Sequence, residues 1–464
     1  MPGLKQAPGG EATTPQGDDA VLIQRGGTDF WIKQQNMSGG ALGVNARNYG
    51  FAPSATASQN QTALQNAIND AAQKGAVIVW MPKGFYQVNG PIYLSYDADN
   101  NTEFLKDASG QGQIQLMGEG VPSNGLLGQD PISRPKGTIL DFHNTTGACL
   151  EAKTTDTSNP IRALRLRNFG LRSRSSDWAI DFKGANTQSG FDKLGLFVLE
   201  DSGSGVRWHD SYLDSFRNCF IAGGSSQGVG MELSNPDVGG AGLLDITQVT
   251  LKGFDIGMKV GDLAQQNGAP SFTSLYSSQF IGNRIGLDIQ FGASVFTHGS
   301  WWESNSERNV FCRGNSSFVD RSGKLGGASP SIACVQFGDD SQGGAVDPVG
   351  HGALYRSQIG TTSVGVRVEG NQNGWSVTCV GTALNTASSG VIAYSVHTGD
   401  AQFDVISPQW QDFGSAFATR YENQGNFGTI IDPDSGIYRY PNLPTSQPAN
   451  TGELWNDGGT VKVS

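Results

Sequence analysis

One short pattern recurs three times in this chain: IGMKV at Ile256–Val260, IGLDI at Ile285–Ile289 and VGVRV at Val364–Val368. Successive side chains of a β-strand point to opposite faces, so each copy has one apolar face and one polar face. The helical repeat of 3.6 residues does not fit these segments. The three copies therefore predict short strands that bury one face.

Bulky apolar anchors recur along the chain at intervals of 28, 23, 31, 29 and 22 residues, at Phe169, Phe197, Phe220, Leu251, Phe280 and Trp302. A repeat of this size cannot bury its own apolar face and is stabilised by stacking on its neighbours. We therefore predict an all-β protein, a parallel β-solenoid of roughly ten coils over about residues 113–422. The largest insertion, Gly314–Gly352, is rich in Gly and Ser and predicts a long loop, either functional or disordered.

Composition limits the kinds of partner. The 464 residues include 65 Gly and carry a net charge of −11, which argues against nucleic acids and anionic membranes but not against a glycan. The five Cys show no CxxC spacing, and Cys219 and Cys312 fall inside the repeats, so we expect buried apolar thiols. No metal, phosphate-loop or nucleophile motif is present, and we predict no cofactor.

A helix is expected at residues 60–74, with Ser58 or Asn60 as its N-cap and one apolar face made by Leu64, Ala67, Ile68 and Ala71. The open end of a solenoid exposes apolar side chains and strand edges, so a helix across that end acts as a cap. We assign residues 41–430 to this capped solenoid domain.

Several motifs in the first third follow in a characteristic order: Tyr49-Gly50, the 62–74 helix, the strand and turn at 77–86, 116–120 and 138–140. This order resembles the start of the pectate-lyase-like right-handed β-helix family. The resemblance, which extends over about residues 44–430, implies a right-handed, single-stranded parallel β-helix. That family contains polysaccharide lyases, hydrolases and bacteriophage tailspikes, so the resemblance indicates fold more than chemistry.

The two ends are similar to those of phage tail proteins. The motif at 18–27, DDAVLIQRGG, looks like the start of proteins that attach to the virion, and residues 1–40 are expected to be either a disordered leader or a docking peptide for other tail or baseplate proteins. Residues 431–464 are similar to a phage tail-type terminus, with a small hairpin around NDGG. These likenesses imply a virion location, assembly in the host cytoplasm, release by lysis and, from tailspikes in general, a homotrimer. The chain has no apolar run of bilayer-spanning length and no signal peptide pattern, and we expect no membrane insertion.

A sugar site is predicted beside the last anchor. If Trp302 points inward with Phe280 and Phe220, the alternation places Trp301 and Glu303 on the outer face. An exposed indole can pack against a sugar ring, and a neighbouring carboxyl group can exchange a proton with the glycosidic oxygen. Trp301 is therefore the predicted stacking residue and Glu303 the predicted catalytic acid or base. The alternative is that Glu303 only bonds to a neighbouring turn.

Two more carboxylates are predicted to be catalytic. Asp214 and Asp245 each lie six residues before an anchor, Phe220 or Leu251. Stacked coils are about 4.8 Å apart, so the two carboxylates would be close neighbours if both face outward. Their repulsion would raise one pKa and provide the acid and base that glycoside hydrolysis uses. The alternative is that both residues cap turns or face solvent.

A lyase would instead need a base and a cation that stabilises the enolate of a uronic acid. The local cluster that offers such groups is Arg207-Trp208-His209, which we predict as further substrate-binding residues.

Three functions follow from these patterns. The first is a phage tailspike or tail-fibre protein that binds bacterial capsule or O-antigen and degrades it by carboxylate acid/base hydrolysis, with a polysaccharide lyase as a variant of it. The second is a non-catalytic virion structural or receptor-binding appendage with the same fold. The third, a free pectinase-like enzyme, is disfavoured by the missing signal peptide and the tail-type ends.

Overall fold

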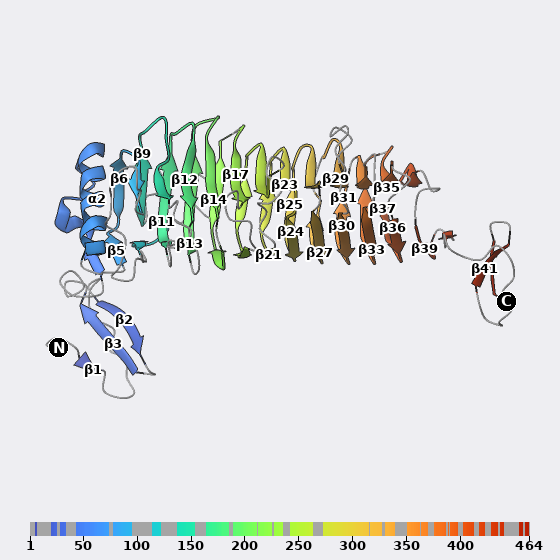
Figure 1. Ribbon diagram of the computed structural model, residues 1–464, viewed down its shortest axis with the longest axis horizontal. Helices are drawn as coiled ribbons and strands as arrows, with labels where there is room; N and C mark the ends of the chain where they lie inside the picture. The colour runs from blue at the N-terminus through green and yellow to red at the C-terminus, as the bar shows by residue number, and fades with distance from the viewer. Residues whose placement is uncertain are drawn as a thin grey trace. The chain divides into compact units, whose positions relative to one another are not determined.

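The chain divides into two compact units, Met1–Phe197 and Val198–Ser464. Figure 1 labels helices and strands of both units. The structure is a computed structural model, and it describes residues 5–6, 20–25, 28–33, 43–73, 78–94, 114–121, 137–153, 164–184, 189–210, 212–224, 227–234, 242–262, 272–314, 316–326, 330–338, 350–361, 363–369, 375–386, 388, 390–397, 402–412, 417–422, 428–434, 437–439, 454–457 and 460–463. Among these residues no helix is long and apolar enough to cross a bilayer.

The first unit begins with an antiparallel sheet of order β1-β3-β2 and continues with one α-helix and parallel strands. Its elements are β1 (Lys5–Gln6), β2 (Ala20–Arg25), β3 (Thr28–Lys33), β4 (Gly43–Asn45), the 3-10 helix η1 (Ala46–Tyr49), α2 (Ala57–Gln73), β5 (Ile78–Met81), β6 (Gly84–Val88), β7 (Ile92–Tyr93), β8 (Gln115–Gly118), β9 (Thr138–Phe142), β10 (Leu150–Lys153), β11 (Arg165–Ser173), β12 (Trp178–Lys183) and β13 (Gly190–Val198).

Helix α2 begins with a reciprocal cap. The Gln59 amide donates to Thr56 Oγ1, and the Gln59 side chain accepts from the Thr56 amide, so Thr56 is the N-cap, not Ser58 or Asn60. Asn60 is buried instead, and its side chain bonds to the backbone of Ala52 and Gln87. The expected apolar face is buried against η1 and β4–β7, as predicted for a helical cap.

Parallel pairing builds the rest of the first unit. One ladder joins β5, β8 and β11, a second joins β6, β9 and β11, and a third joins β7, β10 and β12. Each ladder contains strands far apart in sequence that lie directly side by side, which is the arrangement of a solenoid.

The second unit contains the strand β14 followed by eight successive coils of three strands each, and these strands form three faces. Face A contains β15 (Asp214–Arg217), β18 (Leu243–Thr247), β21 (Phe272–Tyr276), β24 (Ser294–His298), β27 (Ser317–Arg321), β30 (His351–Tyr355), β33 (Ser376–Val380) and β36 (Gln402–Ile406). Face B contains β16 (Phe220–Gly223), β19 (Thr250–Lys252), β22 (Gln279–Ile281), β25 (Trp301–Glu303), β28 (Lys324–Leu325), β31 (Gln358–Gly360), β34 (Ala383–Thr386) and β37 (Gln409–Asp412). Face C contains β14 (Ser204–His209), β17 (Val229–Ser234), β20 (Ile256–Val260), β23 (Ile285–Ile289), β26 (Arg308–Cys312), β29 (Ala333–Phe337), β32 (Val364–Val368), β35 (Ile392–Val396) and β38 (Thr419–Glu422).

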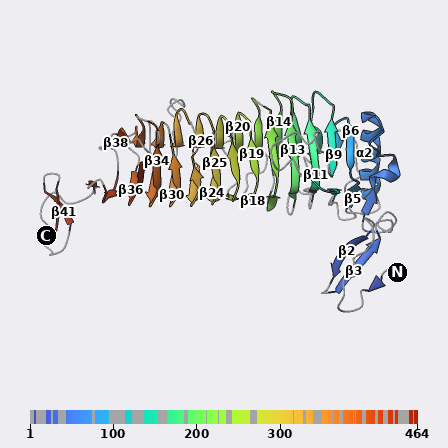
Figure 2. The same cartoon turned by 180° about the vertical axis from the view of Figure 1, so that it is seen from behind.

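Within each face, every strand pairs in parallel with the equivalent strand of the next coil (Figure 2). The three quoted segments are the face C strands β20, β23 and β32. The predicted fold, an all-β parallel solenoid with one helix near its start, is therefore confirmed. The expectation of a long loop at Gly314–Gly352 is wrong, because this segment contains a complete coil, β27 to β29.

The corner between faces A and B is a single residue in the left-handed conformation. It occurs immediately after all eight face A strands, at Asn218, Gln248, Ser277, Gly299, Ser322, Arg356, Gly381 and Ser407. The amide of each of the first seven corner residues donates to the carbonyl of the last face A residue of the next coil, as Ser277 does to His298, and the Ser407 amide donates to Ile431 of β39 (Ile430–Asp432). This hydrogen bond satisfies the backbone amide and helps to offset the unfavourable energy of a positive φ at the corner, just before each face B strand.

All three faces contribute buried side chains to the core, and one row of them comes from the face B strands. Trp302 is fully buried and stacks on Phe280, with ring centroids 5.3 Å apart. Pairing aligns Trp302 with Phe280, Phe280 with Leu251, and Leu251 with Ile221. The anchor predicted at Phe220 is therefore wrong by one residue, because Phe220 aligns with Thr250.

The remaining strands of the second unit form antiparallel pairs. These are β39 (Ile430–Asp432) with β40 (Ile437–Arg439), and β41 (Leu454–Asp457) with β42 (Thr460–Val463), a hairpin at the NDGG sequence. The buried Asp432 carboxylate accepts hydrogen bonds from Trp410 and Tyr421, so this end of the core is stabilised by a satisfied polar contact.

Candidate functional site

Strand β25 has the alternation that the sequence predicts. Trp302 is buried, whereas Trp301 is 38% exposed and Glu303 is half-buried on the outer side of the same strand. The Lys324 ammonium group, on the next coil, lies 4.7 Å from the centroid of a Trp301 ring. Trp301 therefore presents an exposed aromatic surface with a cation beside it.

The predicted pair of carboxylates does not exist. Asp214 aligns with Leu244 and Ser215 aligns with Asp245, which is the same one-residue shift that displaces Phe220. Asp214 points inward, is 1% exposed and accepts a hydrogen bond of 2.9 Å from Trp208 Nε1. Asp245 points outward and pairs with Arg217 at 2.9 Å. The two carboxylates lie on opposite sides of face A, so they cannot share a proton as predicted.

The cluster on β14 is also arranged differently from the prediction. Trp208 is fully buried and packs edge-on against Phe216, so its ring cannot contact a polysaccharide on the outer surface. His209 and Arg207 belong to face C, where His209 Nε2 lies 2.8 Å from Glu232 Oε1 and Arg207 aligns with Glu232.

Glu232 is the centre of these face C contacts. Burial raises the pKa of Glu232, but the hydrogen bond from His209 and the charge of Lys259, 3.2 Å away, outweigh it and lower the pKa. Glu232 is thus a paired anion rather than a proton donor. The seven predicted site residues do not converge: two lie on face B, two on face C, one on the outer side of face A, and two are buried.

A group that the sequence reasoning missed lies along the corner between faces A and B. We define the corner ridge as six exposed residues that flank the left-handed corner in four successive coils: Tyr276, His298, Trp301, Arg321, Lys324 and Tyr355. Tyr276 packs near His298 at 6.4 Å, and the Arg321 guanidinium lies 5.9 Å from the Tyr355 ring. The alternation in the sequence could have predicted that these side chains point outward, because each residue is the last of a face A strand or the first of a face B strand.

Next to the corner ridge, three apolar side chains lie on the outer side of face A. Leu243, Phe272 and Phe296 are each at least 40% exposed, and the two phenyl rings stack at 5.8 Å. Pairing places Leu243 directly beside Phe272. Large apolar groups gathered on an outer wall are typical of surfaces that bind a ligand or a partner.

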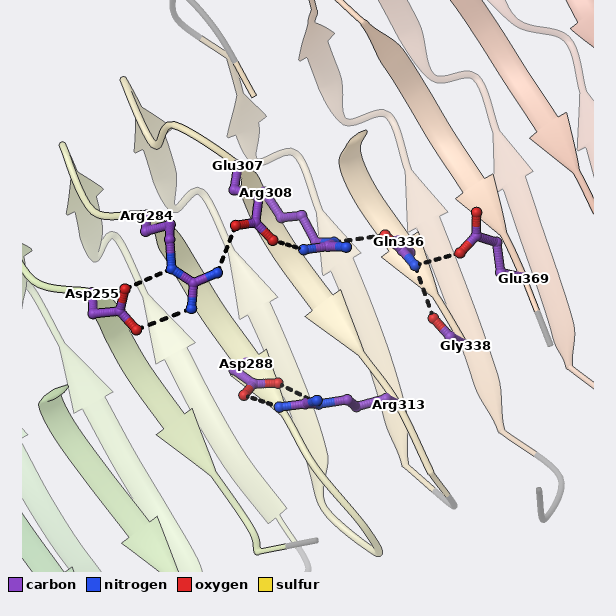
Figure 3. Close-up of polar contacts among 9 residues, drawn as sticks. All are labelled: Asp255, Arg284, Asp288, Glu307, Arg308, Arg313, Gln336, Gly338 and Glu369. Carbon is purple, nitrogen blue, oxygen red and sulfur yellow. Dashed lines mark hydrogen bonds and ion pairs between the residues drawn. The ribbon is translucent and has the colours of Figure 1, made fainter. Parts of the chain in front are cut away.

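Face C has a contrasting surface, in which charges are neutralised by each other (Figure 3). Arg284 holds Asp255 through two bonds of 2.6 and 3.0 Å and Glu307 through one of 2.6 Å. Glu307 contacts Arg308, which bonds to Gln336. Hydrogen bonding to Asp255 raises the pKa of Arg284 further above its ordinary value.

The same face contains a partly buried ion pair, in which Arg313 donates two hydrogen bonds of 3.1 and 2.7 Å to the buried Asp288 (Figure 3). Because each of these carboxylates is held by a guanidinium group, face C is suited to joining coils rather than to proton transfer.

The thiols and the metal-binding side chains offer no reactive centre in the described part of the chain. All five Cys are free and buried, and burial raises the pKa of Cys312 to about 12, so that its thiol stays protonated at neutral pH. No group of three or more His, Cys, Asp and Glu among the described residues could hold a metal ion.

The fold and its outer surface place the chain among parallel β-solenoid proteins. It is similar to the crystal structure of tailspike protein 3 of bacteriophage CBA120, with 10% identity, a TM-score of 0.51, and coverage of 96% of this chain and 71% of that one. It is also similar to a surface adhesin of Streptococcus pneumoniae, with 10% identity, a TM-score of 0.52, and coverage of 91% and 98%. No protein-family model and no curated protein sequence matches the chain. At these identities the likeness shows the fold alone.

Proposed function

We propose that this chain is a phage tail protein that binds bacterial surface polysaccharide along the outer wall of its second unit. The observation that carries the proposal is the corner ridge, in which exposed aromatic rings recur within four successive coils at Tyr276, Trp301 and Tyr355. Coils are about 4.8 Å apart, close to the length of one sugar residue, so successive rings can pack against a glycan that runs along the solenoid. The tailspike similarity in fold and the two tail-type ends support a virion location.

The proposal includes the assembly that these likenesses imply. Residues 1–40 would attach the protein to the tail, and three copies would associate side by side. The described fold suits such association, because its faces are built from parallel strands with regular outward side chains.

Cleavage of the bound glycan is a second proposal. Glu303 shares the outer side of β25 with Trp301, which supports a role as acid or base next to the stacked sugar. Hydrolysis by the usual route needs a second carboxylate about 5–9.5 Å away. Neither coil neighbour of Glu303 in face B supplies one, since pairing aligns Glu303 with Ile281 and the next coil continues as Gly326 after Leu325. Binding is therefore the better supported function.

The test uses the purified full chain and a panel of capsule and O-antigen polysaccharides, with binding followed by biolayer interferometry. We expect Trp301→Ala to weaken binding at least tenfold, since aromatic stacking contributes about 1.5 kcal/mol beyond burial in favourable cases. Trp178→Ala, which removes a half-buried tryptophan of the first unit, is the matched control. Binding that survives Trp301→Ala unchanged would remove the corner ridge as the site.

The same mixtures are assayed for reducing ends and for unsaturated products. Reducing ends that disappear in Glu303→Gln would support hydrolysis, and absorbing products would support a lyase. If neither forms while the glycan still binds, the protein is a non-catalytic receptor-binding appendage.

A further inference from the structure

The corner ridge differs in charge from the rest of the molecule. The chain has a net charge of −11, yet Arg321, Lys324 and the corner residue Arg356 are exposed cations on two successive coils. Among the described outward positions of faces A and B from β21 to β31, Glu303 is the single carboxylate. The ridge is thus locally positive on an acidic protein.

The cations of the ridge are not neutralised by described carboxylates. The charged groups of Arg321 and Lys324 contact aromatic rings, Tyr355 and Trp301, and neither they nor Arg356 form an ion pair with a described carboxylate. On face C, by contrast, guanidinium groups such as Arg284 are paired with acids. Exposed cations held beside aromatic rings remain available to a negatively charged ligand.

The spacing of these groups matches that of a sugar that carries a charge. Trp301 and Lys324 align on adjacent coils, about 4.8 Å apart along the solenoid, and Arg321 and Tyr355 align in the same way. A pyranose ring that packs on Trp301 would place a carboxylate or phosphate substituent within reach of Lys324 or Arg321. A neutral glycan would offer these cations only hydroxyl groups, which form weaker hydrogen bonds with them than a carboxylate or phosphate does.

We infer that the corner ridge binds an acidic polysaccharide, whose repeating unit carries a carboxylate or phosphate group, through Arg321 and Lys324 beside the Trp301 ring, with Arg356 as a further cation one coil along. This inference rests on the proposed function and adds the class of glycan to it. The shared requirement is a negative charge on a sugar polymer, whether it comes from a uronic acid or from a phosphodiester.

The experiment measures binding of the full chain to immobilised polysaccharides of three kinds: uronate-bearing, phosphate-bearing and neutral. We expect binding to one or both acidic kinds and weakening as salt is raised. Arg321→Gln and Lys324→Gln should each raise Kd about tenfold, the effect of losing one charge-assisted contact. Lys83→Gln, which removes an exposed charge from the first unit, should leave Kd unchanged. Circular dichroism confirms that each variant is folded.

Three outcomes would overturn the inference in distinguishable ways. Binding to neutral glycans alone, lost in Trp301→Ala but unchanged in both charge variants, rejects the acidic class and keeps the proposed function. Dissociation of an oligomer in Arg321→Gln, with glycan binding unchanged, would assign the ridge to a second copy of this chain. Absence of binding to any of the three kinds would reject the proposed function as well.

Discussion

Asp320 is an acid in the interior of a coil, and it offers a direct test of the packing. Its side chain is fully buried and accepts hydrogen bonds from Thr297 Oγ1 at 2.5 Å, from the Gly323 amide at 3.0 Å and from Ser357 Oγ. Burial raises the pKa of Asp320, and the three donors and the charge of His298 lower it by less, so the pKa lies above its ordinary value of 3.8. The folded state therefore favours the protonated acid. Its contribution to stability is fully present below the unfolded pKa and is lost as the pH rises through the folded pKa.

Two substitutions separate the charge from the hydrogen bonds. Asp320→Asn keeps an oxygen for Gly323 and Ser357 and turns its amide group toward Thr297, whose hydroxyl can accept as well as donate. We expect this variant to gain stability relative to the wild type as the pH rises. Asp320→Leu leaves the Gly323 amide without a partner, and this alone should cost about 1–3 kcal/mol at any pH.

The measurement is thermal unfolding of the full chain by calorimetry at a series of pH values from about pH 4 upward, because the pKa of Asp320 is raised above its ordinary value. The quantity of interest is the difference in Tm between Asp320→Asn and the wild type. Asp245→Asn, an exposed acid on the outer side of face A, controls for general effects of charge. The reasoning is refuted if the Tm difference does not grow with pH, or if the Asn variant becomes relatively less stable at higher pH.

Three further predictions concern stability, and one concerns activity. Trp302→Ala removes the indole that stacks on Phe280 and should lower the free energy of unfolding by about 3–5 kcal/mol in denaturant titrations, whereas Trp302→Phe should lose clearly less. Arg284→Ala breaks exposed ion pairs and should cost under about 1 kcal/mol, less at high salt; a larger loss would show that the face C ladder acts cooperatively. Thr56→Ala should cost about 1 kcal/mol in the same titrations through loss of the helix cap, while an unchanged midpoint would argue against that cap. Glu303→Gln should leave polysaccharide binding intact and abolish any release of reducing ends, and unchanged release would exclude Glu303 as the acid.

The solenoid could be predicted because every coil must bury one side of its strands, so the same alternation recurs along the sequence. A strand that buries one face must alternate, and the segment Ile285–Ile289 shows this alternation as clearly in the sequence as β23 does in the structure. The same holds for Trp301 and Trp302, whose opposite orientations follow from a period of two. The helical face with Leu64 and Ile68 was predicted in the same way, from a period of 3.6.

The register between coils could not be predicted at β16. The left-handed corner after each face A strand is occupied by Asn218, Gln248, Ser277 and other residues as well as by glycine, so the corner has no single sequence signal. Counting back from Phe220 instead of Ile221 then moved Asp214 to the wrong side of the strand. A register shift of one residue exchanges the inner and outer sides of a strand. This single error therefore accounts for the wrong prediction that Asp214 and Asp245 are neighbours.

The position of the corner ridge follows from the same corner. Because the left-handed residue bends the chain at the corner, the exposed side chains on its two sides, such as His298 and Trp301, both point outward around one edge. Packing does not restrict these positions, so alternation in the sequence cannot reveal which of them bind a ligand. Their chemistry, aromatic rings beside cations without carboxylate partners, is then evidence about function that is independent of the evidence for the fold. A solenoid of identical architecture with neutral, small residues at Trp301 and Lys324 would meet every folding requirement described above, and it should bind no acidic glycan at this edge.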